Sequence, residues 1–115
     1  KYENLQKMDD NSIYFVEEQK HAVKLKVTHK RGIHLSPASV IAEDVKKYES
    51  KVLIDMYNQV SSLDDIKFDA KRVIDIMTLG AVKDSYVIML AKGSDSKEAL
   101  ESQLNLFKTD YGLGN

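Results

Sequence analysis

The segment HAVKLKVTHKRGIHLSPASVIAEDVKKY, residues 21–48, contains the two patterns that decide the fold. Val23, Leu25 and Val27 alternate with polar residues, which is the period-two pattern of a strand with one buried face. Ser36 and Pro37 then predict a helix start, because serine is a frequent N-cap and proline loses nothing at the first helical position. Apolar residues continue at helical spacing: Ala38, Ile41, Val45 and Tyr48.

The pattern extends toward the C-terminus. Strands are predicted at residues 52–57, 66–68 and 86–91, the last from a continuous apolar run typical of a central strand or one buried on both faces. Two more helices are predicted, one ended by Gly80 and one capped by Ser94 or Asp95. This order predicts an α+β open-faced sandwich, a four-stranded antiparallel sheet with three helices on one face.

Residues 1–20 stand apart from this pattern. Residues 1–11 are polar except for Leu5 and Met8, and residues 13–16 form a short apolar run. The stretch fits either a short helix and strand or an arm packed on the domain. We therefore divide the chain into an N-terminal arm at residues 1–20 and one domain at residues 21–115, and we expect the arm to add little to the core.

Composition narrows the possible functions. The 115 residues include no cysteine, which excludes disulfides and thiolate chemistry and is compatible with the cytoplasm, where we expect the protein. The formal net charge is −1, so no general nucleic-acid surface is expected. The longest apolar run, near residues 86–91, is far below the roughly 20 residues of a membrane span, so no membrane insertion is expected.

Histidines are the candidate reactive groups. His21 and His29 begin and end the first predicted strand and fit ordinary surface or edge positions. His34 directly precedes a predicted helix N-terminus, where unpaired amides and the helix dipole stabilise anions. Because an imidazole can act as a nucleophile, His34 could carry a phosphoryl group, although a solvated loop histidine is the ordinary alternative. The pair His29 and His34, without nearby carboxylates, predicts no metal site.

The segment Gly32-Ile33-His34-Leu35-Ser36-Pro37-Ala38 resembles the active-site segment of the HPr family, the histidine-containing phosphocarriers of the bacterial sugar phosphotransferase system. The stretch Lys71-Arg72-Val73-Ile74-Asp75-Ile76-Met77-Thr78-Leu79-Gly80 is similar to the family's second helix. The resemblance covers residues 21–110 and implies the HPr-like open-faced sandwich. It also implies that His34 accepts a phosphoryl group from phosphorylated enzyme I and passes it to a IIA-type partner, with Pro37 shaping the helix start. No metal or organic cofactor is implied, and the protein would be a carrier rather than an enzyme.

The chain differs from the family pattern beside the expected acceptor. Ser36 stands where the family has an arginine that neutralises the phosphate. Ser36 can donate one hydroxyl to phosphate but carries no charge, and Lys30 or Arg31 from the preceding loop could partly replace the arginine. Arg72 stands where many members carry a regulatory serine, so that regulation is expected to be absent.

Partner docking is expected on apolar residues near His34. These residues are Leu35, Val40, Ile74 and Met77. Glu43 and Asp75 lie where the family has neutral or basic residues, and acids there would oppose an acidic partner. A second hypothesis, of another class, is an HPr-fold regulatory or binding module that docks on a target protein through the same residues without transferring phosphate.

Overall fold

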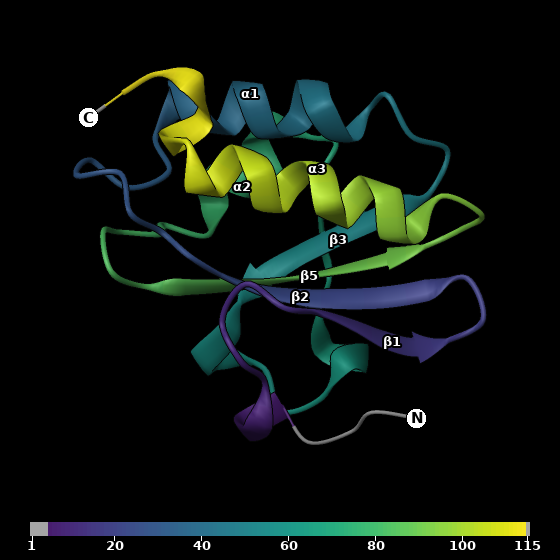
Figure 1. Cartoon of the computed structure of the whole chain (residues 1–115). Helices are drawn as coiled ribbons and strands as arrows, with labels where there is room; N and C mark the ends of the chain where they lie inside the picture. Colours follow the sequence, from purple (N-terminus) through teal and green to yellow (C-terminus); the bar gives the residue numbers. More distant parts are fainter. Residues whose placement is uncertain (1–4, 115) are drawn as a thin grey trace.

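The computed structural model describes residues 5–114 and contains one antiparallel sheet with three α-helices on one face (Figure 1). The strands are β1 (Ile13–Glu17), β2 (Lys20–Lys26), β3 (Lys51–Met56), β4 (Phe68–Asp69) and β5 (Tyr86–Lys92). They lie in the order β1-β2-β5-β3-β4. The helices are α1 (Leu35–Val45), α2 (Val73–Thr78) and α3 (Ser96–Lys108). The predicted α+β class and the three helices are confirmed, but the sheet has five strands rather than four.

The additional strand is β1, which comes from the N-terminal arm. It pairs with β2 through Ile13 opposite Val23, and a two-residue turn at Glu18 and Gln19 joins the strands. Gln19 has a positive φ of 60°, which allows the chain to reverse within this short turn. The sequence underestimated the sheet because the apolar run at residues 13–16 is too short to show a periodicity of its own.

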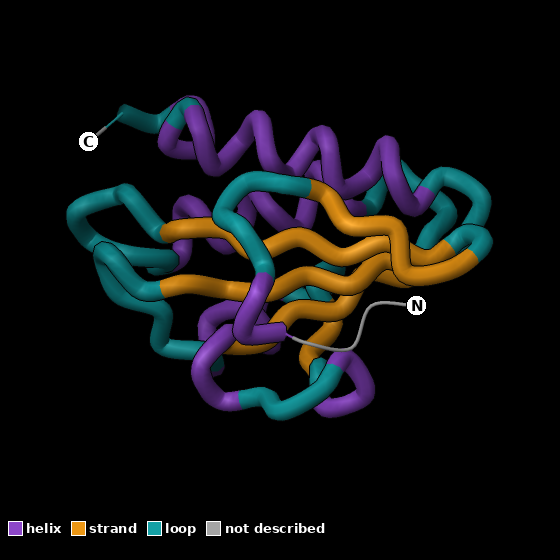
Figure 2. The backbone as a smooth tube through the Cα atoms, turned by 60° about the horizontal axis from the view of Figure 1, so that its bottom comes forward, coloured by secondary structure: helices purple, strands orange, loops and turns teal. Residues whose placement is uncertain are grey.

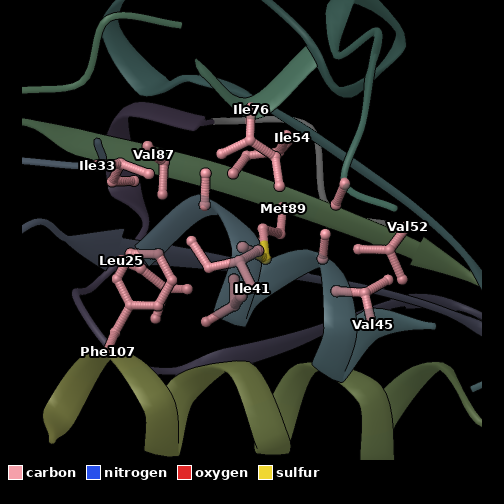
Figure 3. Packing of buried hydrophobic residues seen from close by; sticks show 14 of the residues in the cluster. Leu25, Ile33, Ile41, Val45, Val52, Ile54, Ile76, Val87, Met89 and Phe107 are labelled. Carbon is pink, nitrogen blue, oxygen red and sulfur yellow. The ribbon is translucent and has the colours of Figure 1, made fainter. Parts of the chain in front are cut away.

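The main core lies between the sheet and the three helices. Alternate residues of β2, β3 and β5 point toward the helices, as the labelled side chains of Leu25, Ile54 and Met89 show in Figure 3. Ile41 of α1 and Phe107 of α3 pack onto them from the other layer. The alternating pattern of the sequence therefore corresponds to the face of the sheet that carries the helices.

The opposite face of the sheet is also covered. Ile88 and Leu90 of β5 are buried there, so the apolar run of this central strand is buried on both faces as predicted. The cover consists of three 3-10 turns, η1 (Leu5–Lys7), η2 (Tyr57–Gln59) and η3 (Leu63–Asp65), and the chain between them, as Figure 2 shows from below. We call this cover the irregular layer. It combines the N-terminal arm with the long connection between β3 and β4.

Arm residues enter this second core. Leu5 and Met8 are 6% and 4% exposed, so the expectation that the arm adds little to the core is wrong for these two side chains. Two isolated apolar residues gave no pattern in the sequence, and their partners, such as Leu63, are distant along the chain. Whether residues 21–115 fold without the arm stays a prediction.

Aromatic and ionic contacts hold the irregular layer to the sheet. The Lys24 Nζ atom of β2 lies 4.2 Å from the ring centroid of Tyr57 and 4.5 Å from that of Tyr86. The same ammonium is 3.3 Å from the Asp10 carboxylate. The Tyr57 hydroxyl donates a hydrogen bond to the Leu5 carbonyl. A lysine in the strand, an aromatic ring in the long connection and an acid in the arm thus meet at one place.

Asp95 is the N-cap residue of α3, as predicted, but its carboxylate makes no capping hydrogen bond to the helix. It accepts hydrogen bonds from the backbone N–H groups of Glu49 and Ser50, both at 2.9 Å, and from the Ser50 hydroxyl at 2.5 Å. The hydrogen bond from the Ser50 hydroxyl is the largest influence that lowers the pKa of Asp95. The start of α3 is thereby fixed to the turn before β3.

Candidate functional site

His34 is the N-cap residue of α1. The helix begins at Leu35, and its first backbone bond runs from the Ala38 N–H to the His34 carbonyl at 3.0 Å. Ser36 is therefore the second helical residue rather than the cap, and Pro37 is the third rather than the first. The predicted start was two residues late because a proline without an N–H group fits any position in the first turn.

The N-terminus of α1 can receive an anion. The amide groups of Leu35 and Ser36 precede the first intrahelical hydrogen bond and have no carbonyl partner inside the helix. The first turn contains no acidic side chain that could occupy them. Together with the helix dipole, these amides favour negative charge directly beside the His34 side chain.

The two ring nitrogens of His34 have different surroundings. Nε2 is buried and has no hydrogen-bond partner within residues 5–114. Nδ1 is not among the buried side-chain atoms that lack a partner. Nε2 is therefore shielded from solvent, whereas Nδ1 is not buried in this way.

His34 opens into a pocket of about 340 Å³. Its lining residues are His29, Lys30, Arg31, His34, Ser36 and Leu113. The structure thus brings together the histidine, the hydroxyl-bearing residue of the helix and both basic residues of the preceding loop, which the sequence had connected only as neighbours along the chain. Two cationic side chains beside a histidine and free amides suit an oxyanion ligand.

The loop before His34 is held in one shape. Gly32 has a positive φ of 70°, and a Cβ atom added there would lie 2.3 Å from the Ala81 carbonyl oxygen. The Ile33 N–H donates to the same carbonyl at 3.0 Å. Glycine is therefore required at position 32, and this contact fixes the loop, and with it His34, against the segment that follows α2.

The sequence did not single out His29 and Leu113, which line the pocket, or Tyr111, whose ring lies beside that of His29. His29, expected at a surface or edge position, is only 5% exposed, so that expectation is wrong. The signal was present, because His29 continues the alternation of the inward-facing residues Leu25 and Val27. Tyr111 is 3% exposed, with its ring 4.9 Å from that of Phe107, and its burial raises the pKa of the hydroxyl.

The predicted docking residues fall in two groups. Leu35, Ile74 and Met77 are exposed at 58%, 69% and 40% and lie on α1 and α2, which contact each other. Val40 instead packs partly against the main core and lines a separate groove of about 290 Å³ with residues such as Leu106 of α3. Of the four predicted docking residues, Leu35, Ile74 and Met77 are therefore the ones exposed to a partner.

The two acids that were expected to oppose docking differ in their surroundings. The Asp75 carboxylate accepts a hydrogen bond from the Asp69 N–H at 2.9 Å and lies 4.0 Å from the Arg72 guanidinium. Glu43 is exposed, with its carboxylate 3.9 Å from the Lys46 ammonium. Both carboxylates thus have a cation at about 4 Å, but Asp75 also accepts a backbone hydrogen bond and is the less exposed of the two.

Metal-ligating clusters and membrane-spanning helices are both absent from the described part of the chain. Among residues 5–114, no group of three or more histidine, aspartate or glutamate side chains is placed to hold a metal ion. No helix within the same range is both long enough and apolar enough to cross a membrane.

Known proteins are similar to this chain in both sequence and fold. Residues 22–109 match a family model described as the PTS HPr component phosphorylation site. The phosphocarrier protein HPr of Buchnera aphidicola subsp. Acyrthosiphon pisum is 33% identical over 87 residues, which cover 76% of this chain and 93% of that protein. HPr of Mycoplasma pneumoniae is 31% identical over 71 residues, which cover 62% of this chain and 74% of that protein.

Solved structures give the same result. HPr from Thermoanaerobacter tengcongensis superposes with a TM-score of 0.69 at 26% sequence identity, covering 82% of this chain and 98% of that one. HPr from Bacillus anthracis superposes with a TM-score of 0.63 at 25% identity, covering 76% of this chain and 95% of that one. The match spans more than half of the chain and includes His34 and the helix it caps, so the chain belongs to the HPr phosphocarrier family of the phosphotransferase system.

Proposed function

We propose that this protein is a phosphocarrier that accepts a phosphoryl group on His34 from phosphorylated enzyme I and passes it to a IIA-type partner. The observation that carries the proposal is the position of His34, at the N-cap of α1 and in one pocket with Lys30 and Arg31. Membership of the HPr family supports the same conclusion. The protein would hold the transferred group without turning over a substrate by itself, and a cytoplasmic location follows from the partners that the family implies.

The acceptor atom in this proposal is Nδ1 of His34, because Nε2 is buried. The Nδ1 lone pair forms a bond to phosphorus while the nitrogen–phosphorus bond of the donor breaks and its electron pair returns to the donor nitrogen. Nε2 keeps the ring proton. The phosphoryl oxygens keep their negative charge and accept hydrogen bonds from the N–H groups of Leu35 and Ser36. Transfer to the next protein is the same step in reverse.

Lys30 and Arg31 supply the positive charge that Ser36 lacks. Both line the pocket of His34, from the loop side rather than from the helix. A hydrogen bond to a charged group contributes about 1.5–3 kcal/mol, so one cation from the loop could replace much of the missing contact. Ser36 contributes its backbone N–H group and its hydroxyl.

The docking surface in this proposal consists of Leu35, Ile74 and Met77. Their side chains are exposed on α1 and α2, and apolar residues of this kind dominate the centres of protein interfaces. The partial neutralisation of Asp75 by Arg72 lowers the repulsion of an acidic partner.

A regulatory module that transfers no phosphate is the second candidate. The structural relatives include the Bacillus subtilis catabolite repression protein Crh, with a TM-score of 0.54 at 26% identity, covering 75% of this chain and 90% of that one. Ser36 also favours this candidate, because it replaces the family arginine that neutralises the phosphate. In that case the apolar surface would bind a target protein, and His34 would stay unmodified.

The decisive experiment incubates the protein with phosphoenolpyruvate and enzyme I from the same organism and measures intact mass. We expect one phosphate on the wild type, lost on brief acid treatment because phosphohistidine hydrolyses readily. We expect none on His34→Ala. Acid-stable phosphate on that variant would indicate Ser36 or Ser39 instead. An unmodified wild type in the presence of active enzyme I would favour the regulatory module.

The source of positive charge needs a separate comparison. Lys30→Gln combined with Arg31→Gln should slow phosphoryl transfer about tenfold or more, by loss of one or two charge-assisted contacts. The matched control is Lys46→Gln with Lys47→Gln, which removes the same charge at the far end of α1. Equal rates in the two double variants would contradict the role of the loop.

A further inference from the structure

His29 is the second histidine in the pocket of His34. Its ring is 5% exposed and lies edge-on to the His34 ring, with centroids 5.3 Å apart and planes at 61°. On another side it approaches the buried Tyr111 ring, with centroids 6.4 Å apart. Tyr111 packs in turn on Phe107 of the core. His29 is therefore held by the core, although it lines an open pocket.

The backbone fixes the tautomer of His29. The Arg31 N–H donates to His29 Nδ1 at 3.2 Å. A nitrogen that accepts a hydrogen bond carries a lone pair, so the proton of the neutral ring is on Nε2. No described side chain is bonded to this Nε2–H group, and it is not among the buried atoms without a partner. His29 lines the pocket, and its Nε2–H is a donor that the described side chains leave unused.

We propose that His29 donates its Nε2–H group to the phosphoryl group carried by His34. The inference rests on the proposed function, because it requires a phosphoryl group at His34. A hydrogen bond from a neutral donor to an anionic oxygen is charge-assisted, and this one needs no reorganisation since the ring is already held in place. His29 therefore adds a contact from a ring held by the core to those of the two cations, Lys30 and Arg31.

The two nitrogens of His29 have separate tasks, which substitutions can distinguish. Nδ1 shapes the turn through the Arg31 N–H, and Nε2 contacts the phosphoryl group. Asparagine places an oxygen near the position of Nδ1 and has no group at the position of Nε2. Glutamine places an N–H donor near the position of Nε2 and lacks the acceptor for Arg31. A purely structural role predicts that His29→Asn is the milder change, whereas our proposal predicts that His29→Gln is the milder change for transfer.

The test uses potassium phosphoramidate, which phosphorylates histidine without any partner protein. Its nitrogen–phosphorus bond breaks, ammonia leaves with the electron pair, and the His34 Nδ1–phosphorus bond forms. We expect the phosphorylation rate of His29→Asn to fall about tenfold, and that of His29→Gln to stay within about threefold of the wild type. His21→Asn is the control, since His21 lies at the start of β2 and bonds to Ser96 rather than lining the pocket. His34→Ala shows whether His29 itself is modified.

A spectroscopic measurement on the wild type complements the variants and does not depend on their folding. In ¹⁵N-labelled protein, the His29 Nε2–H proton should move downfield and exchange more slowly when His34 is phosphorylated. Equal transfer rates for His29→Asn and His29→Gln, a slower His29→Gln, or an unchanged Nε2–H signal would overturn the inference. Absence of phosphate on His34 of the wild type from both phosphoramidate and enzyme I would instead overturn the proposed function.

Discussion

The two faces of the sheet are both buried, but they are built in different ways. The helix side is packed by regular elements, with side chains such as Ile41 and Leu100 fully buried at helical spacing. The other side is closed by the irregular layer, in which Leu5 and Met8 of the arm meet Leu63, from a turn far away in the sequence. The site lies at the start of α1, on the helix side. The comparison indicates that the helix side determines the geometry of the site, whereas the irregular layer mainly adds stability.

The largest effect on stability is expected on the helix side. Ile41→Ala removes a fully buried side chain between α1 and the sheet and should lower the free energy of unfolding by about 4 kcal/mol. Leu63→Ala, in the irregular layer, should lower it by only about 2 kcal/mol, because a short turn can relax into the space. Chemical denaturation measures both values. Equal losses would show that the two faces are packed with the same rigidity.

Deletion of residues 1–11 tests the irregular layer more directly. It removes Leu5 and Met8 from the second core, together with the Asp10 carboxylate beside Lys24. We expect a loss of about 2–3 kcal/mol in unfolding free energy, with an unchanged rate of phosphoryl transfer to His34. Unchanged stability would restore the expectation from the sequence that the arm is dispensable. A slower transfer would show that the irregular layer also determines the geometry of the site.

Ser36→Arg tests how the helix side supplies charge. The added guanidinium lies at the second residue of α1 and can contact the phosphoryl group, so transfer should become about tenfold faster. Since Ser36 is not the cap, its loss costs no capping hydrogen bond, and only the unfavourable cation at the helix start reduces stability slightly. Ser39→Arg, one turn further along α1, is the control. An unchanged rate with an intact fold would mean that Lys30 and Arg31 already supply the positive charge that stabilises the phosphoryl group.

The smallest effect concerns the end of the sheet away from the site. Hydrogen bonds, first among them that from Ser50, hold the pKa of Asp95 below its usual range. A carboxyl with a lowered pKa in the folded state stabilises the protein above the pKa of the unfolded chain, about 4, and loses this contribution as pH falls through the folded pKa. Asp95→Asn should therefore lower the midpoint of thermal unfolding by about 4 °C at pH 7, and the difference should disappear in acid. Glu98→Gln on the same helix serves as the control; a difference that persists in acid would exclude the ionic cause.

The sequence predicted the helix side well because its signals are local. The alternation of apolar and polar residues in β2, and the helical spacing of apolar residues in α1 and α3, each reveal a buried face within a short stretch of sequence. The irregular layer could not be predicted in this way. Leu5 and Leu63 are far apart in the sequence and become buried only when the fold brings them into one cluster on the sheet. Similarly, His34 followed from a local motif, whereas Tyr111 and Leu113 reach the site only because α3 returns the chain to it. His29 was within reach, because it continues the inward alternation of β2.

The most direct test of His34 as the phosphoryl acceptor is to locate the phosphoryl group in protein phosphorylated by enzyme I and phosphoenolpyruvate. Nuclear magnetic resonance of ¹⁵N-labelled protein resolves the ring nitrogens and their coupling to phosphorus. We expect a single phosphorus atom bonded to Nδ1 of His34, with Nε2 still carrying its proton. Phosphorus on Nε2, on another residue or on none would contradict it.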